Sequence, residues 1–152
     1  MKPFQISLVL TLFALLPACT TYKLRGVVVY GSQSKIEVVD DDDPRIAKGS
    51  PIEEAAVTVL LDPNSLRNRY LGQTFPNALG EFAVPVDEPG AGVLQYEVWV
   101  MASAPGFSDA DITAPLPGSG ERLLIMLAPG NRRVQRPNQL LDEFERNKRQ
   151  FD

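Results

Sequence analysis

Short stretches of alternating apolar and polar residues cover most of the chain after residue 23. Between residues 55 and 61, Val57, Val59 and Leu61 occupy alternate positions, and Phe82 and Val84 do the same further along. Alternation with a period of two is typical of strands that are buried on one face. Turn-forming Gly, Pro, Asn and Asp residues separate these stretches. The pattern predicts seven strands, at residues 24–30, 55–61, 70–75, 81–86, 93–102, 110–114 and 122–127.

Many short strands with frequent turns predict an all-β fold, an antiparallel sandwich over residues 24–130. The turn-like residues Asn77–Gly80 join two of the strands, at 70–75 and 81–86, which we expect to form a hairpin. Residues 31–50 are polar and include no clear alternation, so this stretch is expected to be irregular.

The last segment, residues 131–152, has a different pattern. It begins with a basic linker and continues after Pro137 with Leu140, Leu141 and Phe144 at helical spacing. Acidic residues come early and basic residues late in this stretch, which complements a helix dipole. The segment is therefore predicted to form a C-terminal amphipathic α-helix.

The first 18 residues are predicted to be a targeting segment. An apolar run from Ile6 to Leu16 follows the basic Lys2, and it is too short for a bilayer core, which needs about 20 residues. A basic start, a short apolar run and small residues before a cleavage point indicate a secretory signal peptide. Leu16, Ala18 and Cys19 resemble the lipobox of bacterial lipoproteins. This resemblance implies cleavage after residue 18 and lipidation of Cys19 by acyl chains such as palmitate.

The lipobox resemblance also implies a location in the cell envelope. Thr20 occupies the position where an aspartate would resemble the inner-membrane retention signal, so we expect the outer membrane if the source has two membranes. Residues 19–23 then form the lipid anchor and a short tether. The folded domain is expected to lie at the membrane surface, on its periplasmic or outer side.

Composition excludes several function classes. The chain carries 15 basic and 19 acidic residues, a net charge of −4, and it has no histidine. An acidic chain argues against nucleic-acid binding, which uses a basic surface. Without histidine, a Ser-His-Asp arrangement or an imidazole metal ligand is impossible. We therefore expect a protein that is not an enzyme and has no cofactor apart from the lipid on Cys19.

One acidic run stands out, formed by Asp40, Asp41, Asp42 and Asp43. Ca²⁺ takes several carboxylate oxygens, so this run is a candidate metal site. Consecutive residues of an extended loop point to alternate sides, however, and no Asp-x-Asp-x-Asp-Gly loop is present. A solvated acidic loop is the other interpretation.

A second candidate site is an apolar surface made of Trp99, Met101, Leu124 and Met126. These residues alternate with the predicted core positions of their strands. If the last strand pairs near residues 93–102, they form one outer patch, and such patches mark partner sites. The alternative is that the C-terminal helix lays its apolar stripe over the patch.

Ordered short motifs over residues 24–129 resemble the carboxypeptidase regulatory-like domain, which is a transthyretin-like Greek-key β-sandwich. They are Gly26-Val27-Val28, the run from Pro51 to Val59, the turn from Asn77 through Gly80 to Phe82, the corner from Ala102 to Phe107, and Leu124 to Leu127. The family has no catalytic residues of its own. The resemblance implies an accessory, adhesive or scaffold module.

Together these features predict a membrane-anchored envelope lipoprotein, a non-enzymatic binding or scaffold module that acts through protein–protein contacts. Two alternatives remain open. One is a module that binds a glycan or a peptide at the cell surface, and the other is a calcium-dependent adhesion module.

Overall fold

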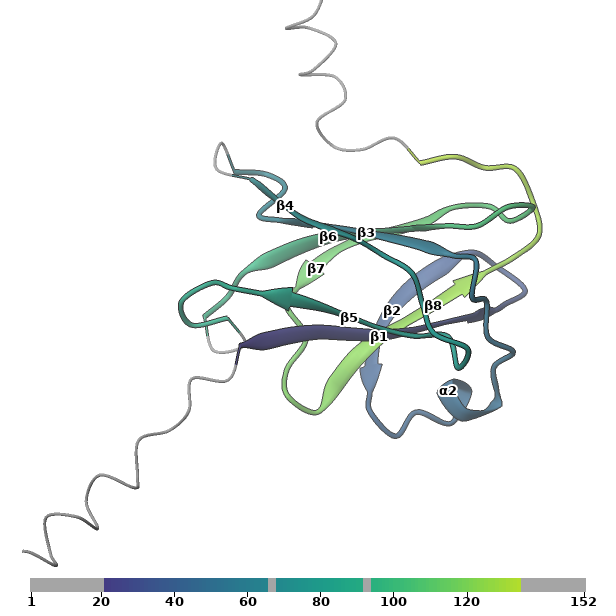
Figure 1. Cartoon of the computed structure of the whole chain (residues 1–152), viewed down its shortest axis with the longest axis horizontal. Helices are drawn as coiled ribbons and strands as arrows, with labels where there is room; N and C mark the ends of the chain where they lie inside the picture. The colour runs from purple at the N-terminus through teal and green to yellow at the C-terminus, as the bar shows by residue number, and fades with distance from the viewer. Residues whose placement is uncertain (1–20, 66–67, 92–93, 135–152) are drawn as a thin grey trace, which may run out of the picture.

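A computed structural model describes residues 21–65, 68–91 and 94–134. The predicted signal peptide, Cys19 and the predicted C-terminal helix lie outside these described residues. Within the described residues the chain forms eight strands and one short helix (Figure 1). Their bounds are β1 (Tyr22–Tyr30), β2 (Lys35–Asp40), α2 (Pro44–Lys48), β3 (Ala56–Leu61), β4 (Arg69–Thr74), β5 (Glu81–Val86), β6 (Glu97–Ser103), β7 (Ala110–Pro115) and β8 (Glu121–Leu127).

The strands build two four-stranded sheets that face each other. One sheet has the order β2-β8-β1-β5 and the other the order β4-β3-β6-β7. Figure 1 shows the two sheets as separate layers, with α2 below the first. This arrangement confirms the prediction of an all-β sandwich.

The core lies between the two sheets and follows the predicted alternation. Val57, Val59 and Leu61 of β3 point inward and join one buried cluster with Leu24 and Val28 of β1. The same cluster includes alternate residues of β5, β6 and β8. Because the side chains of a strand alternate between its faces, the intervening residues point away from this core.

The predicted number of strands was wrong, because residues 31–50 are not wholly irregular. They contain β2, whose Ile36 is 5% exposed and lies in the core, and they contain α2. The stretch Lys35–Asp40 is short and half polar, because β2 lies at the edge of its sheet and much of it faces water. An edge strand of this kind gives a weak sequence signal.

The sandwich is also not purely antiparallel. β1 runs parallel to β8, with Gly26 opposite Leu123 and Tyr30 opposite Leu127. These two strands lie at opposite ends of the chain, so no turn between them could show their relative direction. The local patterns predict strands, but this pairing is set by how the whole chain wraps.

The expected hairpin at residues 70–86 is likewise not formed. β4 pairs with β3, whereas β5 pairs with β1 in the other sheet. The turn after Pro76 therefore carries the chain from one sheet to the other. Asn77 Oδ1 accepts hydrogen bonds from the backbone N–H groups of Leu79 (2.9 Å) and Glu81 (3.0 Å), which stabilises the turn.

Candidate functional site

Only one end of the sandwich begins close to Cys19 in the sequence. β1 begins at Tyr22, so only Thr20 and Thr21 separate Cys19 from the first strand. We call the end where β1 begins the entry end. It also holds the connections 62–68, 87–96 and 116–120. We call the opposite end, with connections 31–34, 75–80 and 104–109, the far end.

The first residue of β1 is held firmly at the entry end. The Tyr22 hydroxyl donates a 2.7 Å hydrogen bond to the carbonyl oxygen of Pro117, and Tyr22 pairs with Val86 across the sheet. Burial raises the pKa of the Tyr22 phenol. The chain therefore enters the domain at a fixed point.

The acidic run does not gather its carboxylates at one place. Asp41 accepts hydrogen bonds from Arg122 Nε (2.6 Å) and Arg25 Nη2 (2.9 Å). These two arginines, Arg122 first, lower the pKa of Asp41. Asp41 therefore fastens the end of β2 to β8 and β1.

Asp43 makes its own hydrogen bonds at the start of α2, with a partner other than those of Asp41. Its carboxylate caps the helix by accepting from the backbone N–H of Arg45 at 2.8 Å. The Arg45 guanidinium also binds Asp43, at 2.8 Å, and Glu37, at 2.5 Å. Hydrogen bonding to Arg45 lowers the pKa of Asp43. Among the described residues, no group of three or more acidic side chains could hold a metal ion.

The structure separates the four residues of the expected apolar patch. Leu124 and Met126 lie on the outer face of the β2-β8-β1-β5 sheet, where Leu124 is fully buried. Val27, Val29 and Leu124 form a second cluster, against which Ile46 of α2 packs. α2 therefore covers this face, and it lies within the stretch that was expected to be irregular.

Trp99 and Met101 lie on the outer face of the other sheet. β6 pairs with β3 and β7, not with β8, so the condition for a joint patch with Leu124 is not met. Trp99 is 2% exposed, and its indole N–H donates to Asp111 Oδ2 at 3.3 Å. Local patterns could place each pair on an outer face, but they could not show that the faces belong to different sheets.

The far end carries a feature that the sequence did not indicate. Three large apolar side chains there are well exposed: Tyr30 (54%), Phe75 (65%) and Leu79 (70%). We call them the far-end apolar residues. The Tyr30 ring meets the ring of Phe107 edge to face, with centroids 6.1 Å apart, which holds Tyr30 in place. Tyr30 is the last residue of β1, Phe75 follows β4 and Leu79 lies in the turn before β5, so no alternation marks them as a group.

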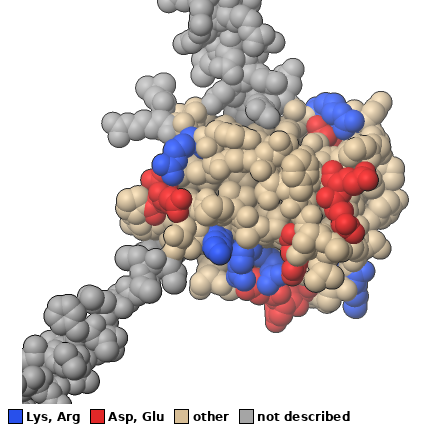
Figure 2. Space-filling view, in the orientation of Figure 1, with Lys and Arg blue, Asp and Glu red and all other residues tan. Residues whose placement is uncertain are grey.

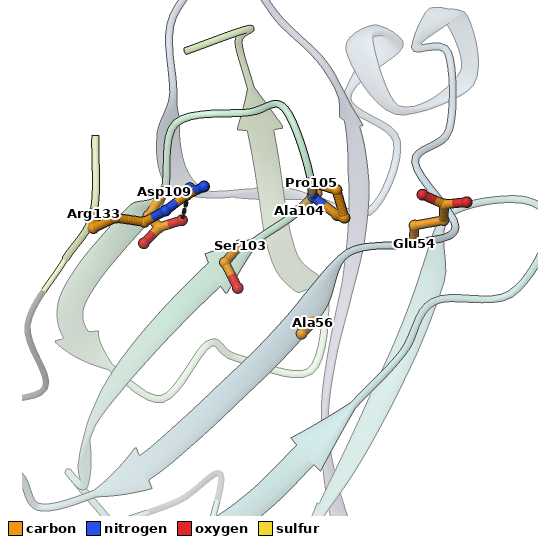
Figure 3. A pocket seen from close by; sticks show the side chains of 7 residues that line it. All are labelled: Glu54, Ala56, Ser103, Ala104, Pro105, Asp109 and Arg133. Atoms are coloured by element: carbon orange, nitrogen blue, oxygen red, sulfur yellow. Dashed lines mark hydrogen bonds and ion pairs between the residues drawn. The ribbon is translucent and has the colours of Figure 1, made fainter. Parts of the chain in front are cut away.

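A hollow of about 360 Å³ lies at the same end (Figure 3). Asp109 and Arg133 point toward each other on one side of it, and Glu54 lies on the other side. Asp109 is buried, and its carboxylate accepts from Arg133 Nη1 (3.0 Å) and the backbone N–H of Val134 (3.1 Å). Because these partners satisfy Asp109, its role is to fasten residues 132–134 to the start of β7.

The charges form no large field of one sign on the face that Figure 2 shows. Acidic and basic side chains there form small mixed groups, and most of the surface is uncharged. Among the helices of the described residues, none combines the length and the apolar character needed to cross a bilayer. No protein-family model matches the chain, and no curated protein matches it in sequence.

Proposed function

We propose that this protein is a lipid-anchored envelope lipoprotein, a non-enzymatic module that binds an envelope protein partner through its far end. The observation that carries the proposal is that the strand that follows Cys19 begins at one end of the domain and the far-end apolar residues lie at the other. β1 begins three positions after Cys19, whereas the far-end apolar residues are exposed at the opposite end. From the motif resemblance, we assign the domain to the transthyretin-like sandwiches of the carboxypeptidase regulatory-like family.

The short tether supports a fixed position at the membrane. Each extended residue spans at most about 3.5 Å, so a lipidated Cys19 lies within about 11 Å of Tyr22. More than one acyl chain is needed for firm anchoring, which agrees with the lipobox resemblance. With an outer-membrane anchor, the entry end faces the bilayer and the far end faces away from it.

The far end has the character of a protein-binding surface. Aromatic residues are enriched where proteins meet, because each supplies a large apolar area with few rotatable bonds. Tyr30 and Phe75 are of this kind, and Leu79 adds an aliphatic side chain. A chain with a net charge of −4 is a poor binder of nucleic acid, which is recognised by a basic surface.

The anchor is tested by membrane fractionation. We expect the wild-type protein to sediment with the envelope and to take up labelled fatty acid, whereas Cys19→Ser should remain soluble and unlabelled. A Cys19→Ser protein that still sediments with the membrane would overturn the anchor.

The partner surface is tested separately by photo-crosslinking in intact cells. A photoreactive amino acid at position 79 should give an adduct with an envelope protein, and Phe75→Asp in the same chain should abolish it. Position 94 is the matched control, because Leu94 is exposed to a similar degree (57%) but lies at the entry end. If only position 94 gave adducts, the partner would bind at the entry end, and the proposed far-end surface would be wrong.

A further inference from the structure

The outer face of the β4-β3-β6-β7 sheet has two cross-strand rows of side chains. Leu60 lies opposite both Tyr70 and Trp99, which forms one row. Thr58 lies opposite Met101 in the next row. Directly opposite residues of antiparallel strands point to the same side. Both rows alternate with the core residues of β3, so they point away from the sandwich core.

Three of these five outward-pointing side chains are nevertheless buried, whereas Met101 is partly buried and Tyr70, on the edge strand β4, is 54% exposed. The exposed fraction is 0% for Thr58, 6% for Leu60 and 2% for Trp99. Leu60 and Trp99 belong to neither of the two apolar clusters that the described residues form. A sheet face that meets water would show such side chains more openly.

Thr58 adds an independent observation on the same face. Its hydroxyl oxygen is buried and has no hydrogen-bond partner within the described part of the chain. Buried hydroxyl groups are nearly always hydrogen-bonded in folded proteins. Within the described residues, this face therefore offers neither a polar partner for the Thr58 hydroxyl nor an apolar cluster that includes Leu60 and Trp99.

The chain leaves the described residues beside this face. After β8, residues 128–134 cross the far end toward the outer side of the β4-β3-β6-β7 sheet (Figure 1). Asp109 fastens Arg133 and Val134, and Arg132 Nη2 lies 3.6 Å from Asp111 Oδ1. Asp111 is the residue that accepts from the Trp99 indole. In the sequence, residues 135–152 follow directly after this point.

We propose that residues 135–152 cover the outer face of β3 and β6, with Leu140, Leu141 and Phe144 packed on Leu60, Trp99 and Met101. The occupant is this segment because it starts next to the face and carries an apolar stripe at helical spacing. The cover also supplies polar groups within reach of Thr58. This face is then part of the domain itself, so it is not the partner surface.

Tryptophan fluorescence tests the proposal directly, because Trp99 is the only tryptophan in the chain. In the purified full-length protein, we expect emission at short wavelength and weak quenching by acrylamide at every protein concentration. Phe144→Asp should shift the emission to longer wavelength and raise the quenching constant severalfold. Gln139→Asp introduces the same charge on the polar side of the predicted helix, and it should change neither value.

A chain that ends at Val134 provides the second variant, with circular dichroism to verify that the sheets remain folded. It should resemble Phe144→Asp in emission and quenching. If Trp99 stays protected in both folded variants, the proposal is wrong. If Trp99 of the wild type is protected from acrylamide only at high protein concentration, a second copy of the chain covers the face. If Trp99 of the wild type is quenched strongly at every concentration, the face is open and available to an envelope partner. Each of these results overturns the proposal.

Discussion

The indole nitrogen of Trp99 lies 3.3 Å from a carboxylate oxygen of Asp111, on neighbouring strands of one sheet. Asp111 thereby satisfies the donor of a side chain that is 2% exposed. A buried indole N–H without an acceptor loses the hydrogen bonds that water would give it. The pair therefore orients Trp99 on its sheet face.

Replacing Asp111 with alanine should lower the free energy of unfolding by about 1–3 kcal/mol, which is the usual cost of leaving a buried donor unsatisfied. Asp111→Asn keeps an oxygen acceptor, so it should cost less. Denaturant unfolding followed by tryptophan fluorescence measures both values. Equal stability of the alanine variant and the wild type would show that the hydrogen bond contributes nothing.

The cover that α2 provides should depend on Ile46, because this residue packs on Val27, Val29 and Leu124. Ile46→Asp should lower the free energy of unfolding by about 1–2 kcal/mol, as expected for losing a partly buried aliphatic side chain. Ala47 is exposed in the same helix, so Ala47→Asp is the matched control. Thermal unfolding distinguishes the two, and an equal loss in both would argue against the packing.

The turn between the sheets should not tolerate a side chain at Gly80. Gly80 has φ +76°, and an added Cβ would lie 2.5 Å from the carbonyl oxygen of Val28. We expect Gly80→Ala to cost more than about 1 kcal/mol, because both strain and a clash act together. At Gly120 an added Cβ meets nothing within 4 Å, so Gly120→Ala should be nearly neutral. Melting temperatures of the two variants provide the comparison.

Acid should weaken the fold through Asp41, Asp43 and Glu37, whose pKa values are lowered by hydrogen bonds from cationic side chains. A folded-state pKa below the unfolded value means that these carboxylates stabilise the fold fully above about pH 4. The stabilisation is lost as the pH falls through the folded-state pKa values. Melting temperatures should therefore fall steeply below about pH 4.

The variant Arg122→Met removes the first partner of Asp41, so its melting temperature should depend less on pH in that range. Lys48→Met removes one positive charge from an exposed position and should keep the wild-type profile. Parallel profiles for wild type and Arg122→Met would contradict this assignment.

Added Ca²⁺ should leave the melting temperature unchanged. Arginines already occupy the carboxylates of Asp41 and Asp43, and a calcium ion would have to displace them. A variant with alanine at positions 40–43 is the control. An increase in melting temperature with Ca²⁺ that disappears in this variant would restore the metal site.

The alternation of apolar and polar residues predicted those features of the fold that each strand's own sequence determines. The alternation in β3, β5, β6 and β8 gave their inward faces, because one side of each strand meets the core. β2 was not predicted because it is a short edge strand and half of its residues are polar. The pairing of β1 with β8 joins residues far apart in the chain, so no local sequence pattern indicates it. This pairing nevertheless determines the sheet on whose outer face Leu124 lies.

The candidate site shows the same division. The sequence marked Trp99 and Leu124 as facing outward, which the structure bears out, but it grouped them on one surface. The far-end apolar residues escaped notice because turns and strand ends have no period. The sequence also places Asp109 on a solvated face with Asp111, whereas Asp109 is buried, because its partners come from a segment after β8.

The central place of β1 has a mechanical consequence. β1 has β8 on one side and β5 on the other, and the hydrogen bonds of both ladders run across the strand. A force that pulls the N-terminal end along β1 must break these bonds together, in shear. It cannot peel the strand from an edge one bond at a time. A domain held by this end should resist extraction far better than one held through an edge strand such as β4.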